Sequence, residues 1–290
     1  MHSFLRAIGF SELKERRDLD QIFGEIMNEP ESKNQIELNP GQKYTEMSKA
    51  FGEHIGITIR GEYDTLGFFH LEHYFPYCTS RIVSVKEAIM FNKRVDTDAY
   101  TGMCDDMRLG ISLIFYMQNS VDYLRRNIPA GSSVTLPVML SALSISGKII
   151  LGVSTESDIM RKRTMGTNRR NQLLQEAKAG NQDAIDSLTI EEIDTFAMVN
   201  RRIRKEDIYS IVDTSFIPYG SESDNYTIIG TILNWTLLTN TATQEKIYEL
   251  TISCNDILFI LCINQKDLLG EPMIGRRFKG NIWMQGLVKF

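Results

Sequence analysis

Ile247–Ser253 (IYELTIS) and Ile257–Ile263 (ILFILCI) decide the fold of this chain, because only Cys254-Asn255-Asp256 separates these two apolar segments. Each segment has the length of a strand and is rich in β-branched and aromatic residues, and the short link fits a hairpin. Three further segments of this kind surround them: Ile208–Ile217, Tyr226–Leu238 and Phe278–Phe290. We therefore expect a C-terminal β-meander or open small barrel.

The segment before this region has a different pattern. Apolar residues recur there at helical spacing in two runs, Leu173–Ala177 and Ile193–Ile203, which indicates helices. We expect a helical connector between two sheet domains. The predicted division of the chain is an α+β sheet domain at 1–155, the connector at 156–206 and a β-meander domain at 207–290.

The N-terminal part combines one helix with several strands. Ser11–Met27 carries an apolar helical face, and Ser11 is placed to cap it;. The polar segment Glu31–Gln42 reads as a surface loop, whereas Ile55–Arg60 and Phe68–Phe75 read as a hairpin;.

Further strands follow with short links between them. They are expected at Ile82–Phe91, Leu109–Met117 and Val134–Ile145, the last turning at Ser146-Gly147;. Strands joined this way, without alternating long helices, favour an antiparallel or mixed sheet. The expected class is α+β.

Composition excludes several classes of protein. The 290 residues include 32 basic and 37 acidic side chains, and the net charge of −5 disfavours binding to nucleic acid;. The longest apolar run is shorter than the roughly 20 residues that cross a bilayer. The four cysteines have no C-x-x-C spacing and no secretory signal is present, so we expect the reducing cytoplasm and no membrane.

Two groups of residues contain side chains that commonly bind metal ions, but their spacing does not fit a metal site. His70 and His73 lie on a predicted strand, where residues three apart point to opposite faces;. Asp96, Asp98, Asp105 and Asp106 lack the calcium-loop spacing, because the twelfth position is Met107;. The sequence predicts a solvated acidic turn here, with no metal and no cofactor.

No catalytic signature is present, neither a phosphate-binding glycine loop nor a serine or zinc hydrolase motif. Carboxylates are the only candidate catalytic groups: Asp105, Asp106, Asp213 and Glu222. Asp213 and Glu222, with Tyr219 and Asp224, surround the turn Pro218-Tyr219-Gly220 and are placed to form a polar pocket. Whether the protein is an enzyme stays open, and the missing motifs favour a non-enzyme.

Basic and aromatic side chains are the candidates for binding a ligand or partner: Arg108, Tyr219, Arg276, Arg277 and Trp283. Together with Trp235 they resemble the stacking and phosphate-binding set of an oligonucleotide-binding barrel. That reading requires Trp235, Trp283 and Arg276 to share one exposed face.

Several strings resemble a family of functionally uncharacterised bacterial proteins, a full-length domain-of-unknown-function family. They are Leu5–Phe10, Gly102–Asp106 followed by Leu113–Tyr116, Ile211–Asp213 through Pro218–Gly220, and Gly275–Gly286. The resemblance covers essentially the whole chain. It implies a bacterial cytosolic protein and carries over no catalytic residue.

Three functions remain open. The first is a non-enzymatic cytosolic protein that binds a small molecule or another protein in a cleft or along a strand edge. The second is an enzyme with a carboxylate-lined cleft between the domains, and the third is a single-stranded nucleic-acid-binding protein that uses the C-terminal β domain. The oligomeric state is open too.

Overall fold

The computed structural model describes residues 2–13, 15–94, 99–106, 109, 111–129, 131–152, 172–190, 214–221 and 223–290. It has two compact units, one made of Met1–Ile150 with Phe216–Phe290 and the other of Leu151–Ser215. Residues 172–178 and 182–190 of the second unit are helical, so a helical stretch follows the first strands as expected. No helix among the described residues is long and apolar enough to cross a membrane.

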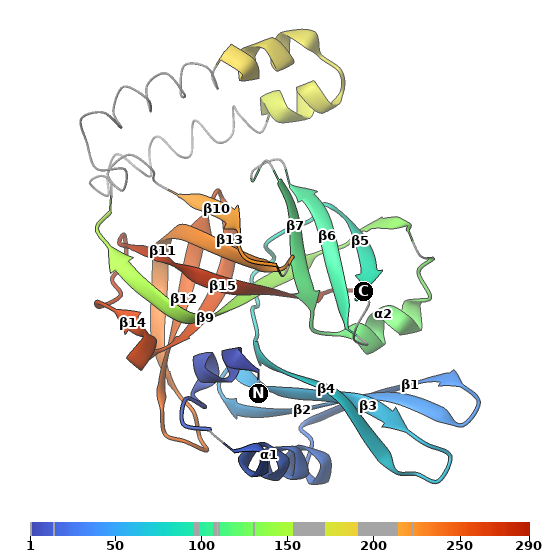
Figure 1. Cartoon of the computed structure of the whole chain (residues 1–290). Helices are drawn as coiled ribbons and strands as arrows, with labels where there is room; N and C mark the ends of the chain where they lie inside the picture. Colours follow the sequence, from blue (N-terminus) through green and yellow to red (C-terminus); the bar gives the residue numbers. More distant parts are fainter. Residues whose placement is uncertain are drawn as a thin grey trace. The chain divides into compact units, whose positions relative to one another are not determined.

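The N-terminal sheet is antiparallel, with strand order β1-β2-β3-β4 (Figure 1). The expected hairpin is confirmed as β3 and β4, but the prediction of a loop at Glu31–Gln42 is wrong, because most of it forms β1. This strand lies at the sheet edge and its residues 32–38 are exposed or half-buried, so it has no apolar alternation to recognise;. The strands are β1 (Ser32–Asn39), β2 (Gln42–Gly52), β3 (Ile55–Tyr63) and β4 (Phe69–Cys78).

Helix α1 (Arg16–Asn28) packs on this sheet through its buried apolar stripe, Leu19, Ile22, Phe23 and Ile26. It begins later than predicted. Glu15 is the N-cap, and it exchanges side-chain and backbone hydrogen bonds with Asp18 in a capping box;. Ser11 instead donates its hydroxyl to Glu245, so its expected role as the cap is wrong.

The second sheet closes into a barrel. Its strands follow the order β11-β12-β13-β9-β15, and β15 pairs back with β11. The expected α+β class with a C-terminal barrel-like sheet is confirmed. The strands are β9 (Val138–Ile150), β11 (Asn225–Thr239), β12 (Lys246–Cys254), β13 (Ile257–Asn264) and β15 (Arg277–Val288).

Strand β9 comes from the first half of the chain and pairs with β13 in parallel and with β15 in antiparallel orientation. The turn predicted at Ser146-Gly147 is wrong, because β9 runs through it and Gly147 pairs with Gly280. A Cβ at Gly147 would lie 2.3 Å from the Phe278 ring. The glycine therefore serves close packing rather than a turn.

The sheet continues past the barrel through β7 (Ile111–Met117), β6 (Tyr100–Asp106), β5 (Ala88–Lys93) and β8 (Ser133–Thr135). Helix α2 (Ser120–Arg126) follows β7. At the other end β10 (Ser215–Pro218) pairs with β11, and β14 (Leu268–Leu269) pairs with β9. The acidic turn expected at Asp105 and Asp106 is wrong, since both lie in β6.

Two apolar cores explain the continuous apolar run in β13. Phe259, Leu261 and Ile263 belong to the core that includes the barrel interior. Ile260 and Cys262 point the other way and join a core shared with α1 and the N-terminal sheet. Because both faces of β13 are covered, apolar residues do not alternate with polar ones.

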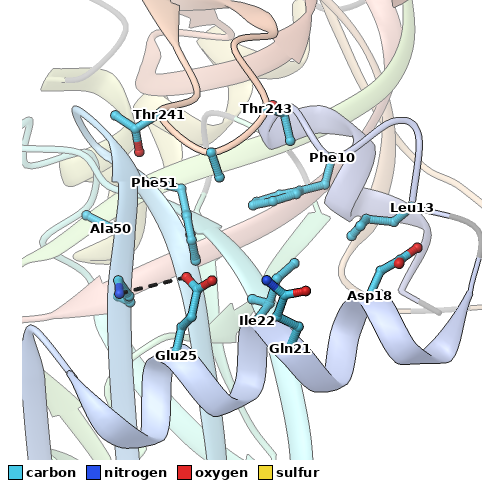
Figure 2. Close-up of a pocket in the computed structure, with 12 residues that line it drawn as sticks. Phe10, Leu13, Asp18, Gln21, Ile22, Glu25, Ala50, Phe51, Thr241 and Thr243 are labelled. Atoms are coloured by element: carbon cyan, nitrogen blue, oxygen red, sulfur yellow. Dashed lines mark ion pairs between the residues drawn. The ribbon is translucent and has the colours of Figure 1, made fainter.

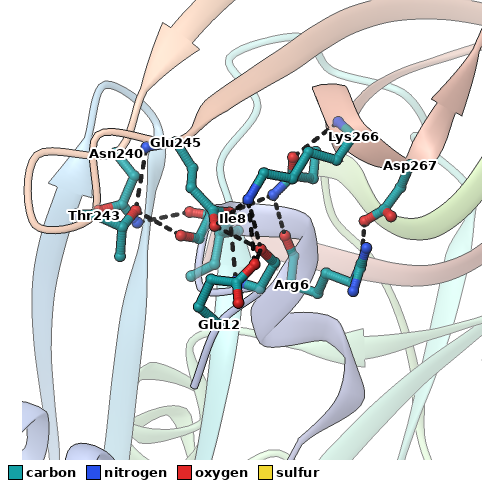
Figure 3. Close-up of polar contacts among 11 residues, drawn as sticks. Arg6, Ile8, Glu12, Asn240, Thr243, Glu245, Lys266 and Asp267 are labelled. Carbon is teal, nitrogen blue, oxygen red and sulfur yellow. Dashed lines mark hydrogen bonds and ion pairs between the residues drawn. The ribbon is translucent and has the colours of Figure 1, made fainter. Parts of the chain in front are cut away.

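A polar network holds the N-terminal segment on the barrel (Figure 3). The 3-10 helix η1 (Ser3–Ile8) is tied through Arg6 to Asp267 in the short helix η2 (Gln265–Asp267). The Asn240 side chain donates to the Ile8 carbonyl at 2.8 Å, and Lys266 pairs with Glu245 at 3.0 Å. This network fixes where the preceding residues, beginning at His2, lie.

Candidate functional site

Two cavities are the candidates for a binding site. The larger, of about 540 Å³, lies between α1, β2 and the turn that joins β11 to β12 (Figure 2). Phe10 and Phe51 line this cavity and pack edge to face, with their ring centroids 5.1 Å apart. Its charged groups are already partnered: Glu25 pairs with Lys49 at 3.9 Å, and Asp18 takes part in the capping box.

The smaller cavity, of about 310 Å³, is built from segments that are far apart in the sequence. Residues 2–4 contribute one wall, and Arg94 follows β5. Asp224 precedes β11, Asn225 begins it, and Trp283 comes from β15. Its volume lies at the lower end of the range for small-molecule sites, roughly 300–1,000 Å³.

Asp224 organises the polar side of this cavity. It is 1% exposed, and its carboxylate accepts hydrogen bonds from Arg94 Nη2 at 3.1 Å and from Trp283 Nε1 at 3.0 Å. Its carbonyl accepts from the Met284 amide. The guanidinium and the indole N–H hold this buried carboxylate in place;.

An aromatic stack forms the opposite side. The rings of His2 and Phe4 lie 4.8 and 5.4 Å from the Trp283 ring, measured between centroids. The His2 amide donates to the Tyr74 hydroxyl at 2.8 Å. Burial lowers the pKa of His2 to about 4, with further lowering by His73 and Arg94, so the imidazole is neutral near pH 7.

Two polar atoms of the cavity lining have no hydrogen-bond partner in the part of the chain that the structure describes. They are His2 Nδ1 and Asn225 Oδ1, and both atoms are buried. Buried polar atoms are nearly always hydrogen-bonded in folded proteins, and an unmade bond costs about 1–3 kcal/mol. His2 and Asn225 both line the smaller cavity, whereas no residue that lines the larger one carries such an atom among the described residues.

The predicted site residues are dispersed. Trp283 lines the smaller cavity, with Asp224 of the expected polar pocket. Asp105 is exposed and bonded to Ser112, while Asp106 is buried, and neither lines the two cavities. Asp213, Glu222 and Arg108 lie outside the described residues. Tyr219 is 51% exposed, and Arg277 is buried whereas Arg276 is half-buried.

The condition set for nucleic-acid stacking is not met. Trp283 is 4% exposed and bonded to Asp224, whereas Trp235 is 39% exposed, so the two tryptophans do not share an exposed face. Among the described residues, no three His, Cys, Asp or Glu side chains are arranged to hold a metal ion. His70 bonds with Asp64 and His73 with Tyr116.

His2 and Arg94 are the site residues that the sequence did not reveal. Neither belongs to a motif, and each reaches the cavity only because η1 and the end of β5 come together with β11 and β15.

Comparison with known proteins identifies the family of the chain. A family model described as "Domain of unknown function, E. rectale Gene description (DUF3881)" matches residues 5–286, which confirms the expected full-length resemblance. No curated protein and no solved structure matches the chain.

Proposed function

Because the chain belongs to this domain-of-unknown-function family, we propose from its own geometry that it is a non-enzymatic protein that binds a small polar molecule in the cavity between His2 and Asn225. The observation that carries the proposal is the pair of buried atoms, His2 Nδ1 and Asn225 Oδ1, without partners among the described residues. A ligand that satisfies them regains two hydrogen bonds, each worth about 1 kcal/mol.

The cavity also limits the chemistry of the ligand. Asn225 Oδ1 is an acceptor, so the ligand has to offer an N–H or O–H donor there. The Arg94 guanidinium and the Asp224 carboxylate already neutralise each other at 3.1 Å. A compact, uncharged or zwitterionic donor therefore fits better than a strong anion, for which desolvation would be costly.

The larger groove supports the proposal less well. Its carboxylates have partners, and no polar atom of its lining is buried without one among the described residues. Of the candidate catalytic acids that the structure describes, Asp105 and Asp106, neither lines one of the two cavities. We therefore favour binding over catalysis.

We propose that the protein acts in the cytoplasm. All four cysteines are buried and none is in a disulfide, as is usual for proteins that fold under reducing conditions. The ligand is then a cytoplasmic small molecule rather than a nucleic acid or a lipid surface.

Native mass spectrometry of the untagged protein, purified gently from its own cells, tests the proposal. The expected spectrum shows one extra stoichiometric mass on the wild-type chain. Asn225→Ala and His2→Phe remove the unpartnered atoms, and the second retains a ring against Trp283; both are expected to lose the extra mass. Gln21→Ala, in the larger groove, is the control that retains it.

Two results would overturn the proposal. One is a wild-type spectrum at the mass of the bare chain. The other is an extra mass that survives in both Asn225→Ala and His2→Phe but is lost in Gln21→Ala, which would assign the ligand to the groove in Figure 2.

A further inference from the structure

The sulfur atoms of Cys78 and Cys262 lie 2.9 Å apart, although 184 positions separate the two residues in the chain. Both side chains are completely buried. Cys78 ends β4 of the N-terminal sheet, and Cys262 lies within β13 of the barrel. Their contact therefore joins two sheets that share no strand pairing among the described residues.

Two hydrogen bonds position the end of β4 at Cys78. Its carbonyl accepts hydrogen bonds from Gln118 Nε2 at 2.8 Å and from the Ser141 hydroxyl. Cys262 is fixed between two paired strands, since it faces Glu249 of β12 and Leu143 of β9. The sulfurs need to approach from 2.9 Å to about 2.05 Å to form a disulfide;.

We propose that Cys78 and Cys262 form a redox-sensitive pair that closes to a disulfide when the protein meets a low-molecular-weight disulfide. The Cys78 thiol loses its proton to solvent, and its thiolate attacks one sulfur of the reagent. The reagent's other half leaves as a thiolate, and a mixed disulfide stays on Cys78. The Cys262 thiol then loses its proton, attacks the Cys78 sulfur and releases the second half.

The net reaction converts two protein thiols and one small disulfide into one protein disulfide and two small thiols. The protein is oxidised by two electrons and the reagent takes them up. Cys78 reacts first because it lies at a strand end, where local opening exposes it more readily than a residue inside a sheet. Burial raises the pKa of Cys262, which disfavours its thiolate. Cys262 therefore acts in the second, intramolecular step, in which its target sulfur already lies 2.9 Å away.

The test is treatment of the folded full-length protein with oxidised glutathione, followed by peptide mapping without reduction. The expected product is a crosslinked peptide pair containing Cys78 and Cys262, with Cys104 and Cys254 still as thiols. Those two cysteines are also buried and serve as internal controls. A rise in the melting temperature is expected too, because the bond closes a long loop of the unfolded chain.

Two variants test the order of the steps. Cys262→Ser is expected to stop at a glutathione adduct on Cys78, whereas Cys78→Ser is expected to give neither adduct nor crosslink. The doubly substituted Cys104→Ser/Cys254→Ser protein is expected to crosslink like the wild type. The inference is overturned if the folded wild-type protein gives no crosslink, or if a crosslink involves Cys104 or Cys254 instead.

Discussion

Arg60 Nε donates a 2.7 Å hydrogen bond to Glu46 Oε2, and both side chains are buried. The two terminal nitrogens of Arg60 donate to the Tyr116 hydroxyl at 2.8 Å and to the carbonyls of Met117 and Gln118. Glu46 also accepts from the Ser120 amide at the start of α2. One ion pair thus joins the N-terminal sheet to β7 and α2.

Replacing Glu46 with Ala is expected to destabilise the fold by about 3–5 kcal/mol, because it leaves a buried guanidinium without its counter-charge. The free energy of unfolding from urea titration measures the loss. Asp122→Ala is the control: Asp122 and Arg125 form an exposed pair at 3.3 Å, whose removal is expected to cost less than about 1 kcal/mol. Similar costs for the two variants would contradict the role assigned to Glu46.

Alanine substitutions at Gly9 and Gly67 distinguish the cost of backbone strain from the cost of steric overlap. Both have a positive φ, 94° and 87°, but a Cβ at Gly9 would lie 2.8 Å from Asn240 Cβ, whereas one at Gly67 meets nothing within 4 Å. Gly67→Ala is expected to cost about 1–2 kcal/mol from the left-handed conformation alone.

Gly9→Ala is expected to cost about 1–3 kcal/mol more, from overpacking against Asn240. Thermal and urea unfolding of the two variants side by side measure the difference. An equal cost would show that the turn after η1 shifts freely, which would contradict the anchoring of η1 in Figure 3.

The local pattern of the sequence predicted strands β11, β12 and β13 well, because their apolar residues and short links are legible without the rest of the fold. It did not predict that β9 lies between β13 and β15. Strand pairing depends on complementary faces of distant segments, and a parallel neighbour leaves no hairpin link to recognise. The edge strand β1 was missed for the related reason that its residues are mostly polar.

The candidate site was predictable only in part. Trp283 and Asp224 stood out as an aromatic and an acid near a turn, yet their hydrogen bond at 3.0 Å follows from the pairing of Asn225 with Trp283. His2 and Arg94 carry no local signal, since a single His or Arg is ordinary on any surface. Only the closed barrel brings these segments together.

Asn225 and Asp224 are adjacent but are expected to respond in opposite ways. Asn225→Ala removes an acceptor that has no partner in the described chain, so the ligand-free protein is expected to keep its stability or to gain up to about 1 kcal/mol. Asp224→Ala leaves Arg94 and the Trp283 N–H without the bonds they make to it.

The expected loss for Asp224→Ala is about 3 kcal/mol or more, measured as the free energy of unfolding after removal of any ligand by dialysis from denaturant. A large loss for Asn225→Ala in the ligand-free protein would indicate that its side chain supports the fold itself. That result would weaken the case for a binding role at this position.

Two histidines are expected to make the protein sensitive to mild acid. Burial lowers the pKa of both His2 and His73 to about 4; His73 and Arg94 lower His2 further, and Arg60 and Arg94 lower His73 further. In the unfolded chain each titrates near 6.5. Between these values the unfolded state binds more protons than the folded state, so stability rises with pH through this range.

The fold is therefore expected to be unaffected by these groups above about pH 6.5 and to lose up to roughly 3 kcal/mol per histidine as the pH falls toward 4. Urea titrations at several pH values measure the slope. The double variant His2→Phe/His73→Phe replaces both imidazoles by rings that do not titrate, and its stability is expected to fall less steeply over the same range. An unchanged slope in that variant would assign the acid sensitivity to other groups, such as Glu245. The pKa of Glu245 is lowered, because the hydrogen bonds from Ser11, Lys266 and Asn264 outweigh the effect of its burial.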